Sequence, residues 1–277
     1  MGILNNISHL KHLDMKKLEN KVIIITGAAM GLGLAAAKEL ASQGAHLTLV
    51  DYNEKSLVEA NTEISKQFPR VKVITVVADV SKEEAVKNYV DETVKAFGRI
   101  DGLYNNAGIE GKQASLAEYD LNVFKKVIDI NLMGVYYAMR YVIPVMQKQQ
   151  YGRIVNVASV GGIRGVLNQT PYVATKHAVS GMTKNAALEY GRDGITANAI
   201  APGAILTPMV AEAFKQVNPE DPKAAETEYA KANPTKRLGL PAEVAKVVAF
   251  LLSDDSSYVS GQTIAIDGGQ SNSYGNV

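Results

Sequence analysis

A tyrosine and a lysine four residues apart are the side chains of this sequence best suited to move a proton. Tyr172 and Lys176 follow Thr170 and Pro171, which are typical of a helix cap and of a first helical residue. Residues four apart share one helical face, so the two side chains are expected to be neighbours. An ammonium beside a phenol stabilises the phenolate and lowers a pKa that is ordinarily about 10. Tyr172 is therefore predicted to be a general acid or base.

A serine ends the β-rich segment just upstream of this pair. Ser159 follows residues 153–158, and its hydroxyl could hold a substrate oxygen by a hydrogen bond. Tyrosine and lysine at this spacing also occur in many helices simply because both side chains pack and solvate a helix surface. The catalytic interpretation therefore depends on the rest of the chain.

A glycine-rich segment near the amino terminus follows a strand and opens a helix. The β-branched run 22–25 leads into this segment, and residues 35–42 have a helical composition. Glycines let the backbone approach a phosphate, and the helix amino terminus supplies free N–H groups and the positive end of a dipole. The segment is predicted to bind the phosphates of a dinucleotide through Gly27, Met30, Gly31, Leu32 and Gly33.

An acidic residue closes the next predicted strand, 45–50. Asp51 stands roughly twenty residues beyond the glycine turn, where a carboxylate can accept hydrogen bonds from an adenosine ribose. The alternative is that Asp51 caps a helix that begins near Asn53. A carboxylate ~4 Å from a phosphate charge costs about 4 kcal/mol at an effective dielectric near 20. Since residues 27–33 contain no Lys or Arg to compensate, NAD is predicted in preference to NADP.

Composition excludes several other classes of protein. The 277 residues carry 29 Lys and Arg against 28 Asp and Glu, so a net charge of +1 attracts neither nucleic acid nor anionic lipid. Cysteine is absent, which excludes disulfides and thiolate metal sites. No apolar run approaches the ~18 residues of a membrane span, and residues 1–20 lack the core of a secretory signal. A cytoplasmic protein that requires no metal is expected.

The remaining segments alternate between strand and helix. Strands are predicted at 71–77, 100–104, 153–158, 195–200 and 262–266, and helices at 81–97, 121–147, around Tyr172 and at 241–252. Ser81 and Glu84 suggest a capping box, and Pro144 suggests a kink near the end of its helix. Crossovers of this length are right-handed, which predicts an α/β, Rossmann-like doubly wound domain whose seven-stranded parallel sheet has helices on both faces.

Ligands on such sheets bind beyond the carboxyl ends of the strands. Six residues follow predicted strand ends and should gather there: Gly27, Asp51, Asp79, Asn106, Ser159 and Pro202. Residues 1–18 are predicted to be an amino-terminal arm and 19–277 the dinucleotide-binding and catalytic domain. Within it, the proline-containing and highly charged segment 207–240 is predicted to be a small mobile lid, with a surface excursion as the alternative.

With these residues in place, the chain resembles the short-chain dehydrogenase/reductase family over residues 18–271. The resemblance rests on motifs in the family's order and spacing: Thr26-Gly27-xxx-Gly31-x-Gly33, Asn105-Asn106-Ala107-Gly108, Asn131, Ser159, Tyr172-xxx-Lys176 and Pro202-Gly203. It implies that Tyr172 is the catalytic acid/base, that Ser159 orients the substrate oxygen, and that Lys176 binds the nicotinamide ribose. Asn131 would hold a proton-relay water.

The same resemblance implies further cofactor contacts. Asp79 and Val80 would lie at adenine, Asn106 with Ala107 and Gly108 near the cofactor ribose, and Ile205 and Thr207, after Pro202 and Gly203, at the carboxamide. Each residue has a structural alternative. Asn131 could be an ordinary buried or surface amide, Asp79 a helix cap, Asn106 a turn residue, and Thr207 with Pro208 the start of a helix.

The resemblance implies reversible hydride transfer between nicotinamide and a secondary alcohol or ketone. Segments 105–112, 158–165, 201–205, 207–210 and 266–271 are similar to a member that reduces a cyclic diketone, so a cyclic ketone is expected. Glu110 and Arg164 could contact it, or could be surface charges or a local ion pair. The apolar side chains expected at the substrate are Ile163, Val166, Leu167, Met209 and Val210.

Several alternatives stay open. The enzyme could be a hydroxysteroid dehydrogenase or a 3-oxoacyl reductase, and a nicotinamide-binding regulator is the non-enzymatic alternative. Family members usually assemble as tetramers through the helices that would carry Asn131 and Tyr172, so a homotetramer is expected.

Overall fold

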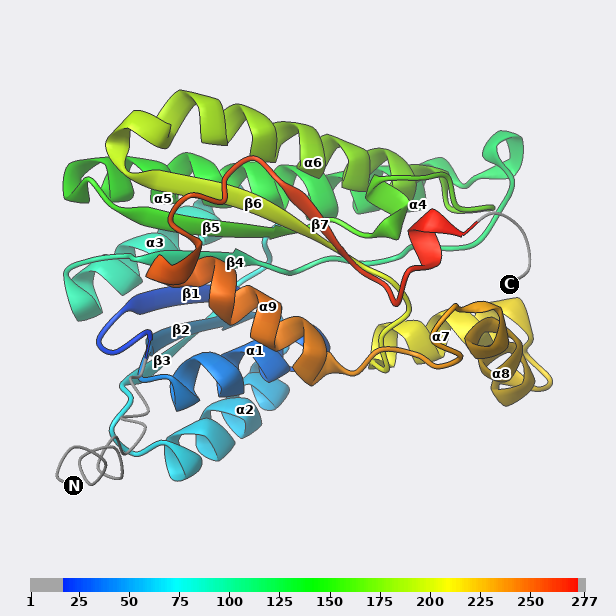
Figure 1. The fold of residues 1–277 in the computed structure, drawn as a ribbon, viewed down its shortest axis with the longest axis horizontal. Coiled ribbons are helices and arrows are strands. Elements are labelled where there is room, and N and C mark those ends of the chain that lie inside the picture. Colours follow the sequence, from blue (N-terminus) through cyan, green and yellow to red (C-terminus); the bar gives the residue numbers. More distant parts are fainter. Residues whose placement is uncertain (1–16, 274–277) are drawn as a thin grey trace, which may run out of the picture.

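The computed structural model describes residues 17–273. Its seven strands form one parallel sheet in the order β3-β2-β1-β4-β5-β6-β7, which confirms the predicted Rossmann-like α/β fold (Figure 1). Residues 1–16 of the predicted arm lie outside the described part of the chain, and Leu18 at its end is fully buried. The strands are β1 (Val22–Thr26), β2 (His46–Asp51), β3 (Val73–Val77), β4 (Gly102–Asn105), β5 (Gly152–Val157), β6 (Ile195–Pro202) and β7 (Thr263–Ile266).

The strand order reverses between β1 and β4. β1 pairs with β2 on one side and with β4 on the other, with Ile24 opposite both Thr48 and Leu103. In open parallel sheets, such a reversal leaves a crevice at the carboxyl ends of the strands. Because all seven strands run in the same direction, the six predicted strand-end residues lie along this one edge, as expected.

Helices cover both faces of the sheet. Side chains of β1 alternate between the two cores: Ile23 and Ile25 pack on one face, and Ile24 packs on the other. Helices α1 (Gly31–Ser42), α2 (Glu54–Gln67) and α9 (Pro241–Leu252) lie on the first face. Helices α3 (Glu83–Phe97), α5 (Gly134–Gln149) and α6 (Thr170–Tyr190) lie on the second.

The predicted helix 121–147 is interrupted. It consists of α4 (Leu121–Ile128), a π-helical turn over Asp129–Met133, and α5, so Asn131 lies in the π turn. Helix α5 continues through Pro144 to Gln149, so the proline does not end the helix, and a bend at this residue stays a prediction. The π turn packs against α6, and such turns are frequent at functional sites of proteins.

Two helix starts also differ from their predictions. The capping box of Ser81 and Glu84 does not form: α3 begins at Glu83 after Lys82, and the Ser81 N–H donates to Asp79 Oδ1 at 2.9 Å instead. Helix α6 begins at Thr170 itself, with Gln169 as the cap and Pro171 in the first turn.

Two short helices occupy the segment predicted to be a lid. α7 (Pro208–Val217) and α8 (Pro222–Ala232) stand beyond the carboxyl edge of the sheet (Figure 1). Each starts with a proline after a capping side chain, Thr207 and Asp221 respectively, and they contact each other through an edge-on pair of Phe214 and Tyr229. Between residues 17 and 273, no helix has the length and apolar character needed to cross a membrane.

Candidate active site

Tyr172 and Lys176 lie side by side on α6, as their spacing predicts. Lys176 Nζ lies 5.5 Å from the centroid of the Tyr172 ring. The lysine is only 3% exposed, and its Nζ donates to the Val157 carbonyl oxygen at 2.7 Å. The last residue of β5 therefore holds the ammonium at the carboxyl edge of the sheet.

Ser159 joins this pair from the end of β5. Its Oγ accepts the Gly161 N–H at 3.1 Å, and its hydroxyl is hydrogen-bonded to Tyr172. The tight turn that follows packs directly on α6, because a Cβ added to Gly162 would lie 2.7 Å from the Lys176 carbonyl oxygen. Glycine at this position brings the serine to the tyrosine.

The pKa values of Tyr172 and Lys176 differ from their ordinary values because both side chains are buried. Burial raises the pKa of Tyr172 to about 12; the Ser159 hydrogen bond opposes this rise, and the charge of Glu110 adds to it. Burial also lowers the pKa of Lys176 to about 8. The predicted lowering of the Tyr172 pKa is therefore wrong for the chain alone, because desolvation outweighs stabilisation of the phenolate by a lysine that is itself desolvated.

Asn131 faces the same site from the π turn. It is fully buried, and its amide pairs with the backbone of Ile109: Oδ1 accepts the N–H at 2.8 Å, and Nδ2 donates to the carbonyl at 2.7 Å. A Cβ added to Gly108 would lie 3.2 Å from Asn131 Oδ1 and 3.6 Å from Lys176 Nζ. The side chain thus fixes the loop beside the lysine, and its role in a proton relay stays a prediction.

The glycine turn forms a cradle at the start of α1. Gly27 and Gly31 have φ values of +64° and +55°, and a Cβ added to Gly33 would lie 2.0 Å from the Gly27 carbonyl oxygen. No side chain caps α1, and its first turn holds no acidic residue, so its first N–H groups are available to bind an anion. Met30, the capping position, is 44% exposed beside Leu32. This arrangement fits the pyrophosphate of a dinucleotide.

Asp51 lies next to this cradle and is 7% exposed. Its Oδ2 accepts the Ala29 N–H and its Oδ1 accepts the Asn53 N–H, both at 3.0 Å. The alternative in which Asp51 caps the next helix is not observed, because the Asn53 side chain caps α2 through the Ser56 N–H. Each carboxylate oxygen keeps further lone pairs with which it can accept a hydrogen bond.

Asn106 connects the two strands at the crevice. Its Nδ2 donates to the carbonyl oxygens of Thr26 at 2.9 Å and Gly27 at 3.1 Å. The Thr26 hydroxyl in turn accepts the N–H groups of Asn106 and Ala107, each at 3.0 Å. The amide of Asn106 is therefore engaged in holding the glycine turn, and a ribose contact would have to use other atoms of the loop.

The remaining residues predicted to contact the cofactor lie toward the two ends of the carboxyl edge of the sheet. Asp79 is exposed and its carboxylate holds the Ser81 N–H, while Val80 packs against Gly134. At the other end, the buried Pro202 closes β6, and the Gly203 N–H donates to the Ile266 carbonyl at 3.0 Å. Thr207 caps α7, and its methyl group would lie 3.6 Å from a Cβ on Gly31, so α7 starts beside the glycine turn.

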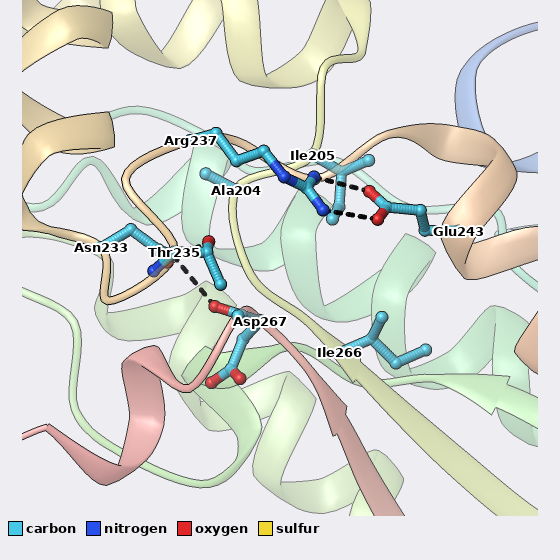
Figure 2. A pocket seen from close by; sticks show the side chains of 10 residues that line it. Ala204, Ile205, Asn233, Thr235, Arg237, Glu243, Ile266 and Asp267 are labelled. Atoms are coloured by element: carbon cyan, nitrogen blue, oxygen red, sulfur yellow. Dashed lines mark hydrogen bonds and ion pairs between the residues drawn. The ribbon is translucent and has the colours of Figure 1, made fainter.

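The Ile205 side chain points into a separate cavity of about 110 Å³ (Figure 2). Arg237 and Glu243 form a bidentate ion pair at its wall, at 2.7 and 2.8 Å, and Asn233 Nδ2 donates to the Asp267 carbonyl at 3.0 Å. None of Ser159, Tyr172 and Lys176 lines this cavity. Ile205, the predicted carboxamide contact, lines this cavity, so the cavity adjoins the predicted cofactor site but is separate from the Tyr172 group.

Four groups at the site were not predicted from the sequence. The Thr26 hydroxyl and the Val157 carbonyl each hold a predicted residue in place. Gln169 donates to the Glu110 carboxylate, and Gln216 of α7 contacts the loop after β4. Only Thr26, by its position directly before the glycine turn, carried a signal in the sequence.

Comparison with known proteins places the chain in one family. A family model described as "Enoyl-(Acyl carrier protein) reductase" matches residues 27–271. Levodione reductase of Leifsonia aquatica is 50% identical over 93% of this chain and 97% of its own. Cyclohexanol dehydrogenase of Acinetobacter sp. (strain SE19) is 40% identical over 94% of this chain and 98% of its own.

Solved structures agree with this placement. The crystal structure of levodione reductase superposes with a TM-score of 0.92, at 50% identity, over 93% of this chain and all of that one. An NAD⁺-bound xylitol dehydrogenase follows at 0.87, with 37% identity over 91% of this chain and all of that one. An actinorhodin polyketide ketoreductase with NADPH gives 0.86, with 33% identity over 92% and 98%. With the motifs and fold described above, these matches show that the chain belongs to the short-chain dehydrogenase/reductase family.

Proposed function

We propose that this protein is an NAD-dependent oxidoreductase that interconverts a secondary alcohol and a ketone on a ring, with Tyr172 as the acid/base. The observation that carries the proposal is the group formed by the Tyr172 hydroxyl, its hydrogen bond to Ser159 and the buried Lys176 ammonium. This group stands at the same edge of the sheet as the uncapped start of α1.

The nicotinamide would supply or accept a hydride at its C4 atom. The residues of the chain then manage the oxygen and the proton. Ser159 orients the ketone oxygen, and Tyr172 gives its hydroxyl proton to that oxygen while the carbonyl carbon gains the hydride, so the ketone becomes an alcohol. In the reverse direction the same tyrosine removes the hydroxyl proton. Lys176 would bind the ribose next to the nicotinamide.

The pKa of Tyr172 favours the acid role. At about 12 for the chain alone, the hydroxyl keeps its proton at neutral pH and is ready to donate it to a ketone. Alcohol oxidation needs the phenolate, which becomes more abundant as the pH rises. Oxidation is therefore expected to be faster at alkaline pH than at neutral pH.

The choice of NAD rests on Asp51. Its carboxylate is buried at the end of β2 and tied to the glycine turn through the Ala29 N–H. A 2′-phosphate placed there would face a negative charge in a partly desolvated site, whereas two ribose hydroxyls could donate to it.

The choice of a ring substrate rests on the apolar side chains and on the relatives. Ile163 and Leu167 lie in the segment after β5, and Met209 lies in the first turn of α7. Their exposed fractions are 40%, 86% and 41%, respectively. The names of two similar enzymes, levodione reductase and cyclohexanol dehydrogenase, point to the same class. A compact, mostly apolar ketone fits these surroundings.

A homotetramer belongs to the same proposal. Large apolar side chains are exposed on the helices expected to form the contacts, among them Leu121 at 63%, Tyr136 at 41% and Leu188 at 83%. Sedimentation of the full chain would give four times 29.7 kDa for a tetramer.

The test of the function is turnover by a panel of cyclic, steroidal and acyclic ketones and 3-oxoacyl thioesters, followed through NADH absorbance. Tyr172→Phe keeps the ring and removes the proton, so turnover should fall by about 10²–10⁴ while NADH binding persists. Tyr190→Phe, at the far end of the same helix, is the control and should retain activity. Near-normal turnover by Tyr172→Phe would refute the assignment.

A further inference from the structure

The loop after β4 passes along the catalytic residues and is held from three sides. Asn131 grips both backbone groups of Ile109. The Ala114 N–H donates to the Asn168 carbonyl at 3.0 Å, which ties the loop to the start of α6. From α7, Gln216 accepts the Gln113 N–H at 3.1 Å. Side chains on this loop therefore have defined positions beside the site.

Glu110 is the acidic side chain in residues 106–114 of this loop. It follows Ile109 directly, is half-buried, and accepts a hydrogen bond from the Gln169 amide, three residues before Tyr172. Its charge is close enough to raise the pKa of Tyr172. A carboxyl group thus stands near the reacting hydroxyl with a neutral amide as its partner.

The charge of Glu110 is not neutralised by this partner. Burial raises its pKa to about 7, and a hydrogen bond with Gln113 opposes this rise. Its negative charge raises the pKa values of both Tyr119 and Tyr172, and Asp120 adds a further negative charge at Tyr119. Near neutral pH the group is therefore available both as an acid and as a carboxylate.

We propose that Glu110 determines substrate specificity by hydrogen-bonding a second oxygen of a ring substrate, remote from the carbon that exchanges the hydride. The proposal rests on the function proposed above. Ser159 and Tyr172 already take the reacting oxygen, and the other side chains expected around the ring are apolar. A second ketone or hydroxyl oxygen is what a carboxyl group in this place can recognise.

The chemistry of Glu110 suits both forms of such a substrate. The protonated carboxyl donates to a ketone oxygen, and the carboxylate accepts from a hydroxyl group. Gln169 and Gln113 bind this carboxyl group, but its two oxygens can together take part in more than two hydrogen bonds, so capacity remains for a substrate oxygen. The inferred substrates are cyclic diketones and hydroxyketones, in preference to cyclic ketones with a single oxygen.

The test compares cyclohexane-1,4-dione with cyclohexanone, using the full chain with NADH. In Glu110→Ala, kcat/KM for the dione should fall by about 10- to 100-fold and that for cyclohexanone by less than threefold. Glu110→Gln keeps a donor and should retain most of the dione activity. Glu118→Ala removes an exposed acid from the same loop and should change neither substrate.

A second readout separates recognition from a structural role. For the wild type, the ratio of dione to monoketone kcat/KM should fall as the pH rises through about 7, because the donor is lost, and for Glu110→Gln it should be constant. Equal losses for both substrates in Glu110→Ala, or a pH-independent ratio in the wild type, would overturn the inference. Absence of turnover with every ketone would instead overturn the proposed function.

Discussion

At the scale of single residues, Asp51 should decide which dinucleotide is used. Replacing it by Ala removes the charge that would repel a 2′-phosphate, so the preference for NAD over NADP, as a ratio of kcat/KM values, should fall by about 100-fold at low salt. Ribose hydrogen bonds are lost as well, so part of this change should appear as weaker binding of NAD.

The matched control for this change is Glu54→Ala. Glu54 is an exposed carboxylate three positions further along the chain, in the first turn of α2. Steady-state kinetics with both cofactors should show an unaltered preference for this variant. An unaltered preference in Asp51→Ala would instead remove the basis for choosing NAD.

Glu110 should also leave a signature in stability. Its pKa of about 7 in the folded chain is above the ordinary value of 4.5, so the unfolded chain releases this proton first and stability falls as the pH rises from 4.5 to 7. Between pH 4.5 and 7, the unfolding free energy of Glu110→Gln should rise relative to that of the wild type. Because the side chain is partly exposed, this rise should be only about 1 kcal/mol. Urea unfolding at pH 4.5 and 7.5 measures the difference, and an equal difference at both values would contradict the burial of this acid.

The adjacency of Tyr172 and Lys176 was predictable from helical spacing, although their proposed role needed the other motifs of the chain. The contacts of Asn106 and Asn131 were not predictable. An amide can donate and accept in several directions, and its partners here are backbone groups of loops that only the fold brings near. The direction of the Tyr172 pKa shift was missed for a similar reason, since burial is a property of the folded chain.

At the scale of elements, the contact between the glycine turn and α1 should tolerate no added atom. In Gly33→Ala the new methyl group would lie 2.0 Å from the Gly27 carbonyl oxygen, so the turn must shift out of its cradle. We expect NADH affinity to fall by at least tenfold, or the protein to lose stability, as measured by NADH titration and thermal unfolding.

Gly191→Ala provides the comparison. A Cβ at this position meets nothing within 4 Å, and its φ of −58° suits alanine. NADH affinity should be unchanged in this variant. If Gly33→Ala behaved in the same way, the close approach would have no role in binding.

Strands and helices followed from sequence where periodicity and buried runs decide them. The seven strands and their parallel arrangement are as predicted, because β-branched runs separated by helices permit few arrangements. The π turn at Asp129–Met133 was not predicted, since one extra residue in a helical turn leaves the composition unchanged. The contacts of this turn are long-range: Asn131 binds the backbone of Ile109, and Gly134, directly after the turn, packs against Val80.

At the scale of the whole molecule, a cluster of ion pairs and the proposed active site lie at opposite edges of the sheet. At the amino edge, Asp254 accepts the Tyr151 hydroxyl at 2.8 Å and Arg153 Nη2 at 3.0 Å, and lies 3.6 Å from Lys21 Nζ. Asp254→Asn should cost about 1–2 kcal/mol of unfolding free energy, because it leaves the buried Arg153 without its anion while Asp254 itself is largely exposed.

This variant should leave kcat/KM unchanged, since the carboxyl edge is not touched. Asp255→Asn is the neighbouring control: its partner Lys17 is exposed, so its effect should stay below about 1 kcal/mol. Chemical unfolding and ketone kinetics on both variants test this separation. Loss of activity in Asp254→Asn at a temperature where it remains folded would argue that the two edges are coupled.

The hydrogen bonds between Thr26 and Asn106 fix the shape of the crevice through contacts of the chain itself. A nucleotide that binds there needs little rearrangement of these residues, so its association should be fast. We predict that the residence time of the nucleotide depends instead on whether α7 separates from the loop after β4, which it contacts through Gln216. Dissociation rates, rather than docking rates, should therefore respond to changes in that outer helix.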